Sequence, residues 1–123
     1  MAARVLIVDD QPLLRARIRE LLASELDFEV VAEAQSGAQA LERYRELRPD
    51  LVTIDIVMPE MDGIETLRRL RSLDPAARVV MVSSEPDPEL VSRSLAAGAS
   101  DFVRKPVAAE ALVAALRHAL ERA

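Results

Sequence analysis

The chain has 123 residues, of which half are hydrophobic and 30% are charged, and its net charge is −5 at neutral pH. This length supports one domain with its own hydrophobic core, and we expect a single domain over residues 1–123. The sequence contains no cysteine, which excludes disulfides and thiolate metal sites. It has no basic stretch and few aromatic residues, which argues against direct binding to nucleic acid.

Two further observations bear on where the protein works. No hydrophobic run reaches the roughly 20 residues that a membrane-spanning helix needs. Acidic residues at positions 9 and 10 come too early for a secretory signal peptide. Together with the lack of cysteine, these features lead us to expect a cytoplasmic protein that makes no membrane contact.

Short hydrophobic runs alternate with amphipathic stretches along the chain. The first half predicts a strand over 5–8, a helix with apolar residues from 13 to 22 and Pro12 in its first turn, a strand over 28–32, and a helix that begins at Ser36 or Gly37 and stops before Pro49. The second half predicts a strand over 51–54, a loop over 56–63, a helix around 64–70, a strand over 79–82, a helix opened by Pro86 and Pro88 that ends at Gly98, a short strand over 102–103, and a helix from about 107 to near the end.

Five strands that alternate with five helices predict an α/β fold with a parallel sheet and helices on both of its faces. Three of the predicted strands run directly into polar residues. Asp9 and Asp10 follow the first strand, Asp55 follows the third and Ser83 the fourth. Because the carboxyl ends of parallel strands share one edge of the sheet, these side chains should meet there, with Lys105 nearby.

The residue types at this edge indicate a metal site. Two carboxylates about 4 Å apart repel by about 4 kcal/mol at an effective dielectric near 20, so either a proton or a cation must relieve the cluster. Oxygen ligands without His or Cys favour a hard divalent ion. Mg²⁺ fits best, because it takes one or two carboxylates and keeps waters for an incoming phosphate.

This arrangement suggests phosphoryl transfer to a carboxylate, which becomes an acyl phosphate. Lys105 is the only lysine among sixteen basic residues, and the other fifteen are arginines. This position therefore indicates a need for a compact ammonium in place of the planar guanidinium of arginine. The metal and Lys105 would neutralise charge on the phosphoryl oxygens. The Ser83 hydroxyl would donate a hydrogen bond to one of them.

Four segments carry a family resemblance: Val-Leu-Ile-Val-Asp-Asp ending at residue 10, Asp-Ile-Val-Met-Pro-Glu-Met-Asp-Gly over 55–63, Val-Met-Val-Ser-Ser over 80–84, and Gly-Ala-Ser-Asp-Phe-Val-Arg-Lys-Pro over 98–106. With them, the chain resembles the receiver domains of two-component response regulators over essentially its whole length. The resemblance implies a flavodoxin-like doubly wound sheet with strand order 2-1-3-4-5. It also implies that a histidine kinase supplies the phosphoryl group.

The resemblance also implies roles for individual residues. Asp55 is the phospho-acceptor, Asp9 and Asp10 are the acidic pair that binds Mg²⁺ with it, and the backbone carbonyl of Val57 is a further metal ligand. Lys105 contacts the phosphate, and the Lys105–Pro106 peptide bond is expected to be cis.

Ser83 and Phe102 occupy the positions of the coupled hydroxyl and aromatic switch. The implied output is a change on the face formed by the fourth helix, fifth strand and fifth helix, near Arg93, Ala97, Phe102 and Val107. The protein would then be a switch and not a conventional enzyme, limited to self-phosphorylation and autodephosphorylation. It would be a monomer, with a dimer on phosphorylation as an alternative.

Some positions differ from the best-known single-domain members of the family. Val57 is often polar there, Ser83 is often Thr, Ser84 is often Ala, and Phe102 is often Tyr. No required chemical group is lost by these differences. They bear on the lifetime of the phosphorylated form, and Phe102 lacks the hydrogen bond of a tyrosine.

Several alternatives remain open from sequence. The output is most like that of chemotaxis regulators that bind a flagellar motor switch, but receivers of DNA-binding regulators and of chemotaxis methylesterases are also similar. A small phosphatase with an aspartate nucleophile commonly needs an acid where Val57 stands. A flavin-binding module would need a phosphate loop where the acidic segment 9–12 lies.

Other singled-out residues have plain structural interpretations. An ordinary core position is the alternative to the switch role for Phe102. Asp62 and Gly63 suit a turn and helix cap. His118, the only histidine, suits a surface or hydrogen-bonded position on the last helix and is given no phosphorelay role. The arginines of the first and third helices suit solvated faces paired with nearby glutamates.

Overall fold

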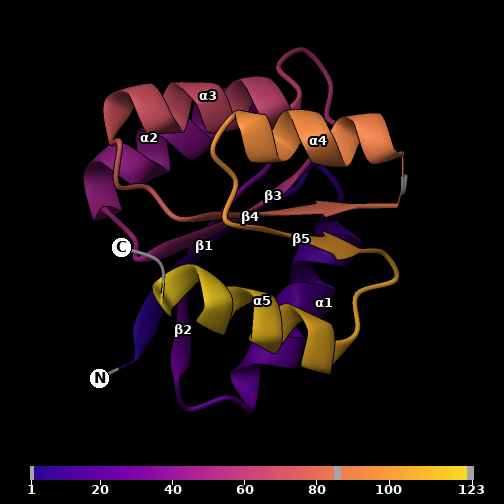
Figure 1. Ribbon diagram of the computed structural model, residues 1–123. Coiled ribbons are helices and arrows are strands. Elements are labelled where there is room, and N and C mark those ends of the chain that lie inside the picture. Colours follow the sequence, from indigo (N-terminus) through magenta and orange to yellow (C-terminus); the bar gives the residue numbers. More distant parts are fainter. Residues whose placement is uncertain (1, 85–86, 122–123) are drawn as a thin grey trace.

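The computed structural model describes residues 2–84 and 87–121 (Figure 1). The elements in chain order are β1 (Ala3–Val8), α1 (Pro12–Ala23), β2 (Phe28–Ala34), α2 (Gly37–Leu47), β3 (Leu51–Asp55), α3 (Gly63–Leu73), β4 (Val79–Ser83), α4 (Pro88–Ala96), β5 (Asp101–Arg104) and α5 (Ala109–Glu121). The strands form one parallel sheet in the order β2-β1-β3-β4-β5. The predicted fold and strand order are therefore confirmed.

Two layers of helices bury the sheet from both sides (Figure 1). Alternate residues of each strand face opposite layers, so that Leu6 and Val8 belong to one core cluster and Val5 and Ile7 to the other. The first cluster lies under α2, α3 and α4, and the second lies under α1 and α5. The central strands β3 and β4 are buried along their whole length, as expected for parallel strands covered on both faces.

The helix ends follow the local chemistry of the sequence. Ser36 and Asp62 cap α2 and α3 by accepting hydrogen bonds from the backbone N–H groups of Gln39 and Glu65. Gly98 has φ of 106°, which confirms it as the left-handed residue after α4. No helix among the described residues is long and apolar enough to cross a membrane.

Two predicted helix boundaries differ from those in the structure. The helix α4 ends at Ala96, two residues before Gly98, with Ala97 as its C-cap. The helix α5 begins at Ala109, because Val107 is drawn into the core cluster under α5 as part of the preceding loop. Pro86, predicted to help open the fourth helix, lies outside the described residues.

Candidate functional site

The carboxyl edge of the sheet gathers the three predicted aspartates. Asp9 and Asp10 follow β1, and Asp55 ends β3, which is hydrogen-bonded to β1. Each residue offers a carboxylate oxygen, and these three oxygens lie within 4.8 Å of one another. Asp9 and Asp55 are only 1% and 5% exposed, so the cluster is at once acidic and largely shielded from water.

The turn after β1 holds Asp9 through three hydrogen bonds. Its N–H donates to the carbonyl of Ala34 at 3.0 Å, which continues the β1–β2 ladder by one residue. Its Oδ1 accepts from the N–H of Gln11 at 2.9 Å, a bond two residues along the chain that is typical of an Asp turn. Its carbonyl accepts from Nη1 of Arg15 at 2.6 Å. The direction of the acidic side chains is therefore set before α1 begins.

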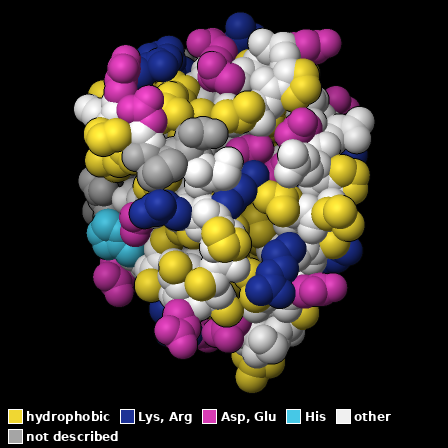
Figure 2. Space-filling model, turned by 90° about the vertical axis from the view of Figure 1, so that its right-hand side faces the viewer, with side chains coloured by type: hydrophobic (Ala, Val, Ile, Leu, Met, Phe, Trp, Pro, Cys, Tyr) yellow, Lys and Arg dark blue, Asp and Glu magenta, His cyan; other side chains and the backbone are white. Residues whose placement is uncertain are grey.

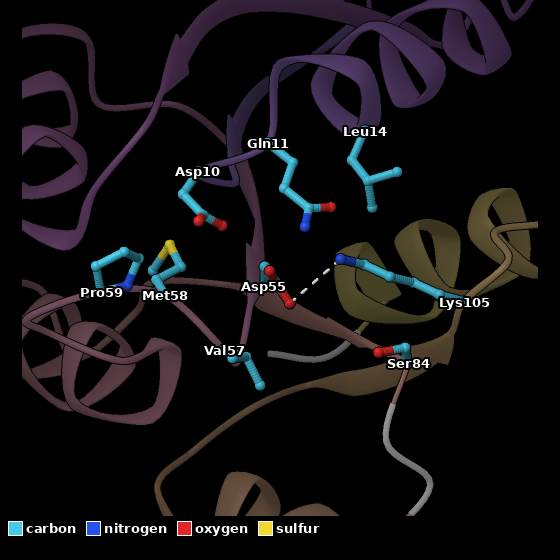
Figure 3. Close-up of a pocket in the computed structure, with 9 residues that line it drawn as sticks. All are labelled: Asp10, Gln11, Leu14, Asp55, Val57, Met58, Pro59, Ser84 and Lys105. Atoms are coloured by element: carbon cyan, nitrogen blue, oxygen red, sulfur yellow. Dashed lines mark ion pairs between the residues drawn. The ribbon is translucent and has the colours of Figure 1, made fainter.

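Lys105 reaches the cluster from the loop that follows β5, the strand at the edge of the sheet opposite β2. Its Nζ lies 3.4 Å from Oδ2 of Asp9. It lies equally 3.4 Å from Oδ1 of Asp55, the ion pair drawn in Figure 3. Its backbone N–H donates to the carbonyl of Ser83 at 2.9 Å, which ties the loop after β5 to the end of β4. The Lys105–Pro106 peptide bond is cis, as expected. One ammonium thus bridges two carboxylates that are 46 positions apart in sequence.

The electrostatics of the cluster favour an additional positive charge. Burial raises the pKa of the Asp55 carboxyl, and the Asp9 carboxylate raises it further, whereas Lys105 and the backbone N–H of Val57 act in the opposite direction. One ammonium does not balance three carboxylates. Oδ1 of Asp10 is buried without a hydrogen-bond partner among the described residues, although buried polar atoms are normally satisfied. A cation bound by these oxygens would fulfil both needs.

A cleft of about 590 Å³ opens next to the cluster. Its lining residues are Asp10, Gln11, Leu14, Asp55, Val57, Met58, Pro59, Ser84 and Lys105 (Figure 3). Figure 2 shows this side of the molecule, where acidic and basic side chains lie next to one another with hydrophobic side chains around them. The side chain of Val57 is 60% exposed. The cleft therefore combines a charged floor with a partly apolar rim.

Two serines stand at the end of the fourth strand: Ser83 is the last residue of β4, and Ser84 follows it. Ser83 is only 1% exposed and does not belong to the residues that line the cleft, whereas Ser84 does. Gln11, Leu14, Met58 and Pro59 also line the cleft without having been singled out. The available signal was their position three to six residues beyond a strand that ends in the site, since the segments after the strands surround any group bound at this edge.

Gly63 has a structural role beyond the turn and cap that the sequence indicated. Its N–H donates to the carbonyl of Ile56 at 2.7 Å. A Cβ atom at this position would lie 2.2 Å from the backbone oxygen of Asp55, closer than any real contact. Only glycine allows the first turn of α3 to lie against the residue that ends β3. The loop over 56–62 is thereby held beside the cleft.

The remaining residues of interest lie outside the acidic cluster. Phe102 is half-buried and packs against the core cluster under α2, α3 and α4. His118 is exposed on α5, and its Nδ1 lies 3.0 Å from Oδ2 of Asp101, which confirms the surface interpretation. The arginines of α1 and α3 also pair with glutamates: Arg15 and Arg19 with Glu33, and Arg69 with Glu65.

Comparisons with known proteins place the chain in a family. The family model described as "Response regulator receiver domain" matches residues 5–117. The chemotaxis protein CheY of Bacillus subtilis is 47% identical over 120 residues, covering 98% of this chain and 99% of the relative.

Two solved structures are similar in both fold and sequence. The response regulator domain of Thermotoga maritima CheB has a TM-score of 0.93 and 35% identity, covering 100% of this chain and 99% of that one. The CheX–CheY–BeF3–Mg²⁺ complex from Borrelia burgdorferi has a TM-score of 0.92 and 32% identity, covering 98% and 90%. With its acidic cluster, its lysine and these relatives, the chain belongs to the family of response regulator receiver domains.

Proposed function

We propose that this receiver accepts a phosphoryl group on Asp55 from a histidine kinase and passes the signal on in chemotaxis. The observation that carries the proposal is the convergence of three carboxylates and the Lys105 ammonium beside an open cleft. The relatives support it, since CheY proteins of several organisms are 40–47% identical over nearly the whole chain.

Asp55 acts as the nucleophile in the proposed reaction. One of its carboxylate oxygens attacks the phosphorus of a phosphohistidine; a P–O bond forms, the P–N bond breaks, and the imidazole leaves with the bond's electron pair and takes up a proton from water. Lys105 already lies 3.4 Å from Asp55 Oδ1, so its ammonium is placed to pair with an oxygen of the incoming group. The product is an acyl phosphate.

The donor set fits Mg²⁺. Asp9, Asp10 and Asp55 supply carboxylate oxygens without nitrogen or sulfur, and Asp10 contributes a buried oxygen with no partner among the described residues. The backbone carbonyl of Val57 is the proposed fourth protein ligand. When bound, the ion neutralises charge on the phosphoryl oxygens and lowers the repulsion between the carboxylates.

The output is proposed to be a population shift of the face formed by α4, β5 and α5. Ser83 would move toward the phosphoryl group and Phe102 would turn inward. The packing of α4 supports a movable element: Ser94 is its only fully buried residue, and the Ser94 hydroxyl has no partner among the described residues. A shift from 1:99 to 99:1 needs about 5.5 kcal/mol, which a multiply charged group at Asp55 is well placed to supply. The proposed partner is a flagellar motor switch.

A second candidate is the receiver part of a longer regulator. The similarity to the CheB response regulator domain favours a methylesterase, and a LuxR-family response regulator from Aurantimonas with a TM-score of 0.93 favours a DNA-binding protein. The chemistry at Asp55 is the same in each case. Pull-down of a motor-switch protein by the phosphorylated chain, compared with the unphosphorylated chain, would separate them.

Intact-mass spectrometry after incubation with acetyl phosphate tests the chemistry. We expect one added phosphoryl group in the presence of Mg²⁺, none in chelator, and none in Asp55→Asn. Asp27→Asn is the matched control, because Asp27 is an exposed aspartate far from the cleft in the α1–β2 connection. Labelling that persists in Asp55→Asn, or that is equal in chelator, would refute the assignment.

A further inference from the structure

Arg15 connects the acidic turn to the edge strand β2 and is not part of the cleft. Its Nη1 donates to the backbone carbonyl of Asp9 at 2.6 Å, and its Nε lies 3.2 Å from Oε1 of Glu33. The Arg15 side chain is only 15% exposed. The other oxygen of Glu33 accepts from Nη1 of Arg19, so each carboxylate oxygen of Glu33 is held by a different arginine.

We infer that Arg15 is a positioning residue, which sets the affinity of the site for its divalent cation by fixing the turn that carries Asp9 and Asp10. The inference rests on the proposed metal-dependent function. Arg15 itself touches no carboxylate of the cluster. It acts through the Asp9 carbonyl, the peptide group that joins the two acidic residues.

The geometry explains why the planar fork of arginine suits this position. The two contacts come from different nitrogens of one rigid guanidinium, so the fork joins the carbonyl to Glu33 in a single defined geometry. Glu33 lies on β2 beside Ile7 of β1, and is therefore anchored to the sheet itself. The turn is thus tied to a rigid element and not only to the first turn of α1. Outer contacts of this kind orient metal ligands.

The positive charge of Arg15 and its hold on the turn have opposite effects on cation binding, which makes the inference testable. A guanidinium near the cluster repels a cation, so removing its charge alone would strengthen binding. Loss of the fork would instead release the turn and weaken binding. Arg15→Lys keeps the charge and removes the fork, and Arg15→Gln removes both.

The experiment measures Mn²⁺ affinity by electron paramagnetic resonance and the Mg²⁺ dependence of acetyl phosphate labelling. We expect Arg15→Lys to bind Mn²⁺ about tenfold more weakly, a usual effect for contacts that orient a ligand. Arg15→Gln should bind more weakly than the wild type but by a smaller factor, because it also loses the repelling charge. The Mg²⁺ concentration for half-maximal labelling should rise similarly, while the labelling rate at saturating Mg²⁺ stays within about twofold of the wild type, because the Asp55–Lys105 geometry is retained.

Arg4→Lys is the matched control. Arg4 lies on β1, and, like that of Arg15, its Nη1 donates to backbone carbonyls. These are the carbonyls of Leu47 at 2.7 Å and Arg48 at 3.2 Å, at the end of the sheet away from the site. A general loss of stability would affect both lysine variants, whereas positioning affects only Arg15→Lys. Should Arg15→Lys fail to fold, Glu33→Gln keeps Arg15 and weakens its anchor, and we expect a smaller loss of Mn²⁺ affinity.

The outcomes separate the inference from the proposed function. If wild-type protein binds no Mn²⁺ and is not labelled, the proposed function fails and the inference fails with it. If the wild type binds and is labelled, but Arg15→Lys has unchanged affinity and Arg15→Gln binds more tightly, Arg15 acts only through its charge and the inference alone is overturned.

Discussion

Replacing Asp55 by asparagine should stabilise the protein in the absence of divalent cations. The carboxylate lies within 4.8 Å of oxygens of Asp9 and Asp10, so each like-charge pair costs at least about 3.5 kcal/mol at an effective dielectric of 20. Lys105 at 3.4 Å returns about 5 kcal/mol on the same scale. The repulsion therefore exceeds the attraction by about 2 kcal/mol, and the burial of Asp55 adds to the cost.

We expect Asp55→Asn to raise the free energy of unfolding by about 1 to 3 kcal/mol at pH 7.5 in chelator, since solvent around the partly exposed Asp10 screens part of the repulsion. Urea denaturation followed by circular dichroism measures it. Asp27→Asn, which removes an exposed partner of Arg117 2.9 Å away, should instead lose no more than about 1 kcal/mol.

The pH dependence has a definite sign. The pKa of Asp55 is raised in the folded state, so the folded protein holds that proton more tightly than the unfolded chain does. The associated stability is complete below the unfolded pKa of about 3.9 and is lost as the pH rises through the folded value. The advantage of Asp55→Asn should therefore be small near pH 4 and grow toward neutral pH. An asparagine variant that is no more stable than the wild type at pH 7.5 in chelator would refute this electrostatic account.

Two further substitutions test the loop beside the cleft. Gly63→Ala places a Cβ 2.2 Å from the backbone oxygen of Asp55, so we expect a loss of about 1 to 3 kcal/mol in urea denaturation and slower labelling by acetyl phosphate; unchanged labelling would show that the loop tolerates displacement. Val57→Asn puts an amide at the mouth of the cleft, where the present side chain is 60% exposed. Because an amide can orient a water beside the acyl phosphate, we expect several-fold faster loss of the phosphoryl group in a time course by mass spectrometry, and an equal or slower loss would contradict that role.

Local chemistry in the sequence was sufficient to predict a parallel α/β sheet and the convergence at its edge, whereas the strand order came from the family resemblance. The alternation of short apolar runs with amphipathic stretches predicted a parallel sheet, and strands that end in Asp9, Asp55 and Ser83 predicted where a site would form. The helix caps could be predicted in the same way. Asp62 caps α3 with its own side chain, and Gly98 follows α4 with a left-handed backbone that glycine favours. These features depend on residues close together along the chain.

Other features depend on contacts between distant segments, and only the tertiary structure determined them. Ser84, which the sequence analysis did not select for the site, lines the cleft, because the cleft wall is assembled from segments that follow β1, β3, β4 and β5. Arg15 was expected on a solvated face and paired with a nearby glutamate; it does pair with Glu33, but its side chain is only 15% exposed, and it also donates to the Asp9 carbonyl.

The sequence by itself determined which chemical groups stand at the strand ends, because periodicity and turn residues act over a few positions. The tertiary structure decided which of those groups touch. Lys105 meets Asp9 across 96 positions, and its 3.4 Å contact depends on how five strands stagger and twist, a property of the packed whole that no local pattern encodes.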